Sequence, residues 1–311
     1  MKITKEETVT LLKQNDKFAI ICHSEPDGDT LGSGYALCRA LQKLGKRAKV
    51  ICEDKIPSNY GFFKSIIVDD DFNPEYVVSA DLADESLLGE FEETYGGKID
   101  LSIDHHISNT DYAKNTLFEA AAATAEIIYE LIKLLKVEID CEIAKSLYAG
   151  IATDTGCFRF SNTTKQSHLI AAELMNFDFN LGELNFSLFE FKSKRRIMIE
   201  TAMIKRLEYY FNGKVVVTSL SKTILDMAKG EDISGISSIP RRIEGVELSI
   251  TFKEQEPNIW KVSMRSNTYV NVQNICAAFD GGGHAKAAGC RIKGIFEECR
   301  DNILSEVEKH L

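Results

Sequence analysis

The N-terminal half of the chain alternates short apolar runs with longer helical patterns. Residues 18–22 form a continuous apolar run, and apolar positions at helical spacing follow over 31–44. Further short apolar runs and helical patterns lie at 49–52, 76–80, 101–103, 120–135 and 142–152. Continuous apolar runs that alternate with helices are typical of parallel strands buried on both faces. We therefore predict an α/β domain with a parallel sheet and helices on both of its faces.

The pattern changes after residue 178 and meets a basic run near residue 192. Strand-like and helical patterns resume at 215–220, 223–229, 246–252, 260–264 and 296–311. The sequence thus predicts an N-terminal domain over 1–180, a linker over 181–192 and a smaller α/β domain over 193–311.

The charge is distributed unevenly between the two halves. The net charge is −10, and residues 1–190 carry 18 basic and 32 acidic residues, whereas 191–311 carry 19 and 15. An acidic N-terminal half disfavours long duplex DNA as a partner, because phosphate binding needs a basic stripe with many contacts. The uneven charge suits a carboxylate-rich metal site in the N-terminal half, combined with a modestly basic C-terminal module that holds a short anion.

The cysteines and the N-terminus indicate a cytoplasmic location. The eight cysteines include no C-x-x-C pair, and residues 1–16 are polar without an apolar stretch. Several cysteines lie in apolar runs and are expected to be small buried side chains. No apolar run approaches the ~18 residues of a transmembrane helix, so we expect no membrane partner.

Acidic and imidazole side chains follow three of the predicted strands, at His23, Asp27, Asp29, Asp81, Asp104, His105 and His106. Ligands of open α/β sheets gather at the carboxyl ends of the strands. Taken alone, the turn 27–29 reads as a surface turn in which Asp29 or Thr30 caps the next helix. Taken alone, His105 and His106 read as one packed and one exposed imidazole. Their common location favours one shared site.

Asp154 adds a fourth carboxylate to this site, because it ends an otherwise apolar helix. A buried carboxylate needs a partner, and no neighbouring Lys or Arg in the sequence offsets the four negative charges. Two divalent cations would neutralise them if Asp81 and Asp154 bridged the ions. The predicted ligands are His23, Asp27, Asp29, Asp81, His105 and Asp154. Mixed carboxylate and imidazole ligands suit Mn, Fe, Zn or Co better than Mg or Ca.

These motifs resemble a known family. His23-x-x-Pro-Asp27-Gly-Asp29, the isolated Asp81, Asp104-His105-His106 and Asp154-Thr-Gly156 are similar to the four successive motifs of the DHH phosphoesterase superfamily. Gly281-Gly-Gly-His284 and Val262-Ser-Met-Arg265-Ser266 resemble the DHH-associated C-terminal substrate domain. The resemblance spans residues 18–292. A compact two-domain chain of this length resembles the bifunctional oligoribonuclease and 3′-phosphoadenosine 5′-phosphate phosphatase type.

The resemblance implies two divalent metal ions, with Mn²⁺ favoured. One ion would be held by His23, Asp27, Asp81 and Asp154, and the other by Asp29, Asp81, His105 and Asp154. Such a pair activates water for attack on phosphorus and stabilises the charge on the phosphoryl oxygens. Asp104 and His106 are the expected catalytic residues beyond the ligands: Asp104 would orient a neighbouring imidazole, and His106 would support a ligand or face the phosphate.

The resemblance places substrate binding in the C-terminal domain, at Arg265, Gly281, Gly282, Gly283 and His284. The glycines would let backbone N–H groups approach a phosphate, and His284 would begin a short helix. Arg265 would pair with phosphate through two hydrogen bonds. An ordinary glycine turn and a plain salt bridge are the alternatives. A phosphate-binding site at a fixed distance from the metal ions would favour substrates of a few nucleotides.

The leading hypothesis is a manganese-dependent phosphoesterase that hydrolyses very short RNA to mononucleotides and 3′-phosphoadenosine 5′-phosphate to AMP. The alternative is a phosphodiesterase of cyclic or linear dinucleotides. A regulatory protein without activity is disfavoured, because all six ligands are present, and an inorganic pyrophosphatase is disfavoured by the C-terminal motif. The expected partners are short single-stranded RNA or a small nucleotide, not long duplex DNA or a membrane, and a homodimer stays open.

Overall fold

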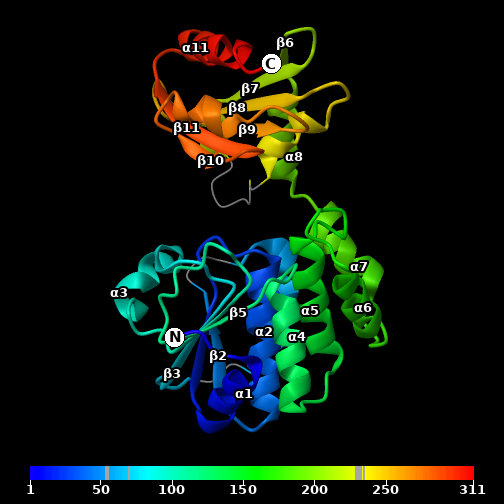
Figure 1. The fold of residues 1–311 in the computed structure, drawn as a ribbon. Coiled ribbons are helices and arrows are strands. Elements are labelled where there is room, and N and C mark those ends of the chain that lie inside the picture. The colour runs from blue at the N-terminus through cyan, green and yellow to red at the C-terminus, as the bar shows by residue number, and fades with distance from the viewer. Residues whose placement is uncertain (53–55, 69–70, 228–232, 234) are drawn as a thin grey trace. The chain divides into compact units, whose positions relative to one another are not determined.

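The chain divides into two compact units, Met1–Phe191 and Lys192–Leu311, drawn from blue to green and from green to red in Figure 1. The computed structural model describes residues 1–52, 56–68, 71–227, 233 and 235–311. Residues 181–192, expected as a linker, hold α7 (Leu181–Asn185) and a π-helical turn, η3 (Phe186–Glu190). No helix in these ranges is long and apolar enough to cross a membrane.

The first unit is built on a five-stranded parallel sheet with the strand order β2-β1-β3-β4-β5. Its strands are β1 (Phe18–Ile21), β2 (Ala48–Ile51), β3 (Tyr76–Ala80), β4 (Leu101–Asp104) and β5 (Asn115–Phe118). The four strands expected from apolar runs are present. β5 was not predicted, because only Leu117 and Phe118 of its four residues are apolar. The predicted α/β fold class is confirmed.

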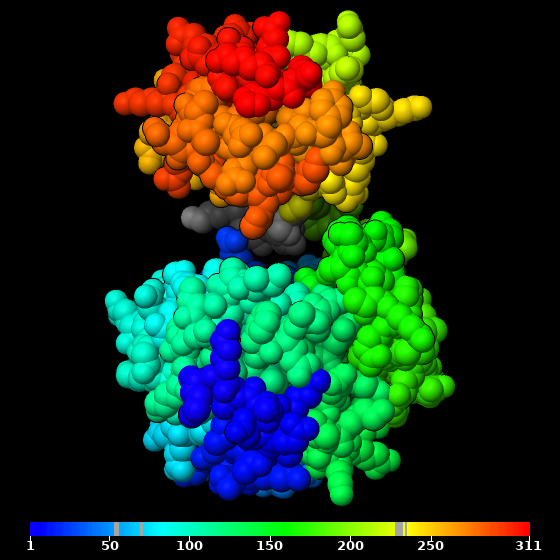
Figure 2. Space-filling view, viewed as in Figure 1, coloured from blue at the N-terminus to red at the C-terminus, as the bar shows by residue number. Residues whose placement is uncertain are grey.

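Helices cover both faces of this sheet (Figure 1). Alternate strand residues separate two apolar clusters: Ile20 and Val78 face the main core, while Ile21 and Val77 face a smaller one. The main core lies under α2 (Gly28–Lys43), α4 (Thr124–Leu135) and α5 (Cys141–Asp154), with α1 (Lys5–Gln14), η1 (Ser58–Ser65) and α6 (Lys165–Leu174). The smaller cluster lies under η2 (Glu85–Phe91) and α3 (Glu92–Tyr95). In Figure 2 the N-terminal residues, in dark blue, cover part of the green surface of the same unit.

Helices α2 and α5 approach each other closely through glycines. A Cβ atom on Gly32 would lie 2.5 Å from the carbonyl oxygen of Ser146 and 2.9 Å from the backbone nitrogen of Gly150. A Cβ atom on Gly28, at the first turn of α2, would lie 2.4 Å from Thr153 Oγ1, near the last turn of α5. The close packing therefore brings the beginning of α2 against the end of α5, where several of the predicted ligands lie.

The second unit is built on a six-stranded mixed sheet with the order β10-β11-β9-β8-β7-β6. The strands are β6 (Glu208–Tyr210), β7 (Val215–Leu220), β8 (Leu248–Glu256), β9 (Ile259–Ser266), β10 (Gly282–His284) and β11 (Ala287–Lys293). The helices are α8 (Lys194–Ile204), α9 (Lys222–Met227), η4 (Ile236–Ser238), η5 (Pro240–Arg242), α10 (Val272–Ala277) and α11 (Phe296–Glu308). One sheet face forms an apolar core with α10 and α11, and the other packs in part against α8 and η4.

The glycine-rich segment before His284 forms part of a β-hairpin. The prediction that His284 begins a short helix is wrong, because Gly282–His284 forms a strand that pairs antiparallel with Ala287–Gly289. The glycines thus belong to a β-hairpin, and Gly283 has a φ of 137° that only glycine adopts readily. The helix expected over 223–229 is described as α9 up to Met227, and its last two predicted residues lie outside the described residues.

Replacing Gly32 tests the close packing of α2 on α5. Gly32→Ala should lower the free energy of unfolding by about 2 kcal/mol, because the new Cβ meets backbone atoms that cannot turn away. Urea unfolding followed by circular dichroism measures this. Gly61→Ala is the matched control, since nothing lies within 4 Å of the added Cβ. Equal unfolding midpoints for the two variants would contradict the packing described.

Candidate metal centre

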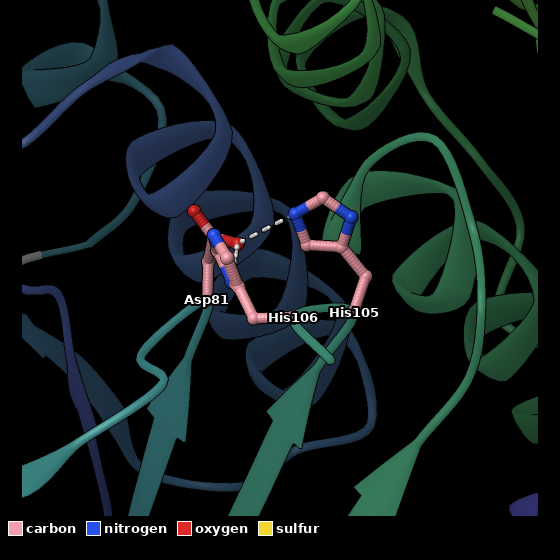
Figure 3. A group of neighbouring side chains, drawn as sticks. All are labelled: Asp81, His105 and His106. Atoms are coloured by element: carbon pink, nitrogen blue, oxygen red, sulfur yellow. Dashed lines mark ion pairs between the residues drawn. The ribbon is translucent and has the colours of Figure 1, made fainter. Parts of the chain in front are cut away.

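The six predicted ligands are brought together at the carboxyl ends of β1, β3 and β4. Three groups of ligand atoms each lie within 4.8 Å of one another: Asp81 with His105 and His106, His23 with Asp27 and Asp81, and Asp29 with His105 and Asp154. Figure 3 shows Asp81 and the two histidines following adjacent strands, with their polar atoms converging. Asp81 and His105 each belong to two of the groups, and Asp81 is the residue that the groups of His23 and His106 share.

His105 is held in the tautomer of a metal ligand. Its Nδ1 lies 3.0 Å from the carbonyl oxygen of Ala121, which can only accept, so Nδ1 carries the proton. The lone pair of Nε2 then faces Asp81 Oδ1 at 3.5 Å and Asp154 Oδ2 at 3.7 Å. This Nε2 atom is buried and has no hydrogen-bond partner. A buried lone pair that faces two carboxylates is repelled by both, and a cation between them removes the repulsion.

His23 has the same arrangement on the other side of Asp81. Its Nδ1 lies 2.7 Å from the carbonyl oxygen of Ser24, so its Nε2 faces Asp27 Oδ1 at 3.7 Å and Asp81 Oδ2 at 4.0 Å. Burial lowers the pKa of His23, but the adjacent Asp27 carboxylate outweighs burial and raises it. The two oxygens of Asp81 therefore face different histidines, as expected for a carboxylate shared by two ions.

Asp81 is held in place by an unusual backbone conformation. It follows β3 with a φ of 62°, in the left-handed region that few non-glycine residues adopt. Its backbone N–H donates to the carbonyl oxygen of Ile103, and its Oδ1 accepts from Thr124 Oγ1 at 2.9 Å. Burial, with the charges of Asp29 and Asp27, raises the pKa of Asp81 well above its usual value. Strain of this kind is typical of functional positions.

Two helix N-termini hold the side chains of Asp27 and Asp29. Asp27 is the N-cap of α2 and accepts from the N–H groups of Asp29 and Thr30, so the prediction that Asp29 or Thr30 caps this helix is wrong. Asp29 instead accepts from the first N–H groups of α4, at Thr124 (2.6 Å) and Ala125 (3.0 Å). A carboxylate is favoured at the positive end of a helix.

Burial and mutual repulsion dominate the electrostatics of the site. Burial raises the pKa of Asp29 to about 8, with further contributions from the charges of Asp154 and Asp27. The pKa of Asp154 is also raised, chiefly by burial. Within the described part of the chain, no Lys or Arg forms an ion pair with Asp27, Asp29, Asp81 or Asp154. The donor set and its uncompensated charge therefore fit divalent cations.

Asp104 and His106, the predicted catalytic residues, form a tight pair. Asp104 is buried, and its Oδ1 lies 2.8 Å from His106 Nδ1 and accepts from the backbone N–H of His105. Its Oδ2 accepts from Asn109 Nδ2 at 2.6 Å. The hydrogen bond to Asp104 raises the pKa of His106, whose side chain is 43% exposed. This geometry suits Asp104 to hold a protonated His106 with Nε2 free to donate.

Sequence reasoning missed two residues that hold the ligands. Thr124 contacts both Asp81 and Asp29, and Asn162 Nδ2 lies 3.1 Å from the carbonyl oxygen of Asp154 and 3.5 Å from its Oδ2. Thr124 lies far along the chain from both carboxylates, so nothing in its local sequence links it to the site, whereas Asn162 follows Asp154 by only eight residues. Phe158 packs against the core and stacks on His168, while Phe160 is largely exposed.

The predicted substrate-binding residues share one face of the second sheet. His284 pairs with Ala287, and Ala287 pairs with Arg265, so Arg265 and His284 flank a small side chain on the same face. Gly281, Gly282 and Gly283 lie beside them in the hairpin. Arg265 is half-buried, and its Nη1 donates to the carbonyl oxygen of Met264.

Comparison with known proteins identifies both units. The DHH family, N-terminal domain, matches residues 17–151, and the DHHA1 domain matches residues 212–311. The bifunctional oligoribonuclease and PAP phosphatase NrnA of Thermus thermophilus is 31% identical over 303 residues, which cover 94% of this chain and 89% of the relative. The protein of the same name from Bacillus subtilis is 25% identical, over 98% of this chain and 97% of the relative.

Solved structures share the fold. An exopolyphosphatase-related protein from Bacteroides fragilis has a TM-score of 0.83 and 22% identity, and the match covers 98% of this chain and 95% of that chain. RecJ from Thermus thermophilus in complex with Mn²⁺ has a TM-score of 0.59 and 14% identity, over 98% of this chain and 55% of that chain.

The raised pKa of Asp29 predicts a stability that depends on pH and metal. A carboxyl group with a raised folded-state pKa contributes stability below its unfolded value, near 3.8, and loses it as the pH rises through about 8. Divalent cations bind the deprotonated form. The increase in Tm on adding Mn²⁺ to protein freed of metal should therefore be larger at pH ~8 than at pH ~5.

The control for this prediction is Asp29→Asn, which removes the titrating group and keeps an oxygen at the N-terminus of α4. Metal-free Asp29→Asn should lose less stability between the two pH values than the metal-free parent protein. A Tm increase with Mn²⁺ that is the same at both pH values would contradict the electrostatic account of the site.

Proposed function

The chain belongs to the DHH family and carries a C-terminal DHHA1 domain, and from this premise we propose that it hydrolyses very short RNA to mononucleotides and 3′-phosphoadenosine 5′-phosphate to AMP, with two Mn²⁺ ions. The chain is a hydrolase of the phosphoesterase type. Its relatives named bifunctional oligoribonuclease and PAP phosphatase match over nearly the whole chain, which supports both substrates.

The observation that carries the proposal is the shared position of Asp81. Its two carboxylate oxygens face the Nε2 lone pairs of His23 and His105, and each histidine is fixed by a backbone carbonyl. This arrangement supports one ion on each side of Asp81, the first with Asp27 and the second with Asp29 and Asp154. Imidazole and carboxylate ligands together favour Mn²⁺ over Mg²⁺.

The protein's own residues orient the substrate and compensate its charge. Bound divalent ions supply an activated water and offset the negative charge that builds on the phosphoryl oxygens. The proposed role of His106 is to donate from Nε2 to a phosphoryl oxygen, since Nδ1 is bound to Asp104 and the pKa of the ring is raised. Arg265 is proposed to hold a second phosphate of the substrate through its guanidinium.

The alternative function, that of a phosphodiesterase dedicated to cyclic or linear dinucleotides, is not favoured. The relatives that match over most of the chain carry the oligoribonuclease and PAP phosphatase name. A basic surface long enough for duplex DNA is not expected either, because the chain carries a net charge of −10.

A comparison of substrates tests the proposal directly. With Mn²⁺ supplied, kcat/KM should be high for RNA of about two to five nucleotides and for 3′-phosphoadenosine 5′-phosphate, and lower for RNA of about twenty nucleotides and for cyclic dinucleotides. Release of mononucleotides is followed by chromatography. Preferred turnover of cyclic dinucleotides, or binding of short RNA without hydrolysis, would contradict the proposed function.

Replacing Asp154 tests the dinuclear site. Asp154→Ala should lower kcat/KM for both substrates roughly a thousand-fold, because a lost ligand removes several kcal/mol of charge stabilisation. Bound Mn²⁺ per chain, measured by elemental analysis, should fall as well. Asp178→Ala removes an exposed acid from the same unit and should change neither value. Near-normal turnover of Asp154→Ala with its full metal content would contradict the assignment.

A further inference from the structure

Three cationic side chains lie side by side on the second sheet and have no part in the site described so far. Lys253 of β8 pairs directly with Lys261 of β9, and Lys261 pairs directly with Arg291 of β11. Directly paired residues of antiparallel strands lie on the same face. Their neighbours Val262 and Cys290 face the apolar core, so this row, named the cationic row here, lies on the opposite face.

The cationic row has no compensating acids. Among the residues that the structure describes, none forms an ion pair or a side-chain hydrogen bond with Lys253, Lys261 or Arg291. Burial lowers the pKa of Lys253, and the nearby charges of Lys261 and Arg265 lower it further. Lys261 and Arg291 are exposed. Like charges directly opposite one another destabilise a sheet, so the row weakens the fold unless an anion lies on it.

The cationic row and the glycine hairpin border the same cavity. A cavity of about 500 Å³ is lined by Lys261 and Arg291, by the backbone of Gly281 and Gly282, and by Phe279, with Asp280 as its one acidic residue. Phe279 packs against the apolar core. Cationic side chains at such a cavity attract the phosphate backbone of a single-stranded nucleic acid, and Phe279 forms part of the apolar wall.

Arg265 and the cationic row lie on the same face, at different positions along the strands. Lys261 and Arg265 are four residues apart on β9, which corresponds to roughly 13 Å along the strand. Successive phosphates of one nucleic acid strand are ~3.4 Å apart along a duplex axis and farther apart in an extended strand. An oligonucleotide of several residues can therefore place different phosphates at the two positions.

We propose that Lys253, Lys261 and Arg291 form a second phosphate-binding site, which holds the backbone of an RNA oligonucleotide beyond the phosphate at Arg265. This inference rests on the proposed function and extends it. The row adds nothing to binding of a single nucleotide, and its contribution grows with each phosphate that reaches it. The enzyme then binds oligonucleotides of several residues more tightly than dinucleotides, while Arg265 and the hairpin act on every substrate.

Charge reversal at the centre of the row tests this. We compare Lys261→Glu with Lys214→Glu, which places the same charge change at an exposed lysine just before β7 that forms no ion pair with the residues that the structure describes. For each variant, kcat/KM is measured with 3′-phosphoadenosine 5′-phosphate and with RNA of increasing length at several salt concentrations. For Lys261→Glu, the ratio of kcat/KM for RNA of about seven nucleotides to that for the bisphosphate should fall about tenfold, and the salt dependence should become about one unit shallower.

Stability provides an independent readout. Lys261→Glu replaces two repulsive cross-strand pairs with two attractive ones, so its Tm should rise by a few degrees while activity on longer RNA falls. Lys261→Arg keeps the charge and should retain the length dependence of the parent protein. Loss of activity together with a lower Tm would overturn the proposal, because the residue would then support the fold.

The remaining outcomes separate this inference from the proposed function. An equal loss of kcat/KM on all substrates would place Lys261 in the primary site, and no loss at any length would leave the row without a role in binding; either result overturns the second site. A parent protein that hydrolyses neither RNA nor the bisphosphate would overturn the proposed function first, and this inference with it.

Discussion

The structure depends on burying like charges next to one another. Asp29 and Asp81 are buried at one end of the parallel sheet beside the half-buried Asp154 and the exposed Asp27, and the Nε2 atoms of two half-buried histidines point toward this group. In a protein interior such a group is unfavourable unless protons or cations compensate it. Much of the surrounding structure serves to hold it: the capped starts of α2 and α4, the left-handed backbone of Asp81 and the glycine contact between α2 and α5. The N-terminal unit therefore contains a group of acidic side chains whose negative charge is not compensated by its own cationic side chains.

The C-terminal unit has the opposite imbalance. Cationic side chains are paired with each other across three strands, and Arg265 is half-buried without an acidic partner among the described residues. Under the proposed function, a phosphodiester substrate would supply the charge that this surface lacks, and divalent ions would supply the charge that the other unit lacks. Binding of these ligands would then stabilise each unit. The uneven charge of the two halves, −14 and +4, reflects this division.

The sequence predicted the parts of the site that depend on local order. Asp81 and His105 could be placed because apolar strands of a parallel sheet end at the same edge, and Asp154 because it ends an apolar helix. It did not predict contacts that join distant segments, such as the bonds of Thr124 to Asp29 and Asp81. It also misjudged His284, because successive glycines precede a hairpin as readily as a helix. Strand β5 was missed since its four residues carry too little apolar pattern.

The central claim is that Asp81 lies between two cations, one on the side of His23 and one on the side of His105. Diffraction from crystals grown with Mn²⁺, recorded near the manganese absorption edge, tests it most directly. The account predicts two anomalous peaks, one bonded to His23 Nε2 and Asp81 Oδ2 and the other to His105 Nε2 and Asp81 Oδ1. A single peak, or peaks that leave either histidine nitrogen without a ligand bond, would contradict it.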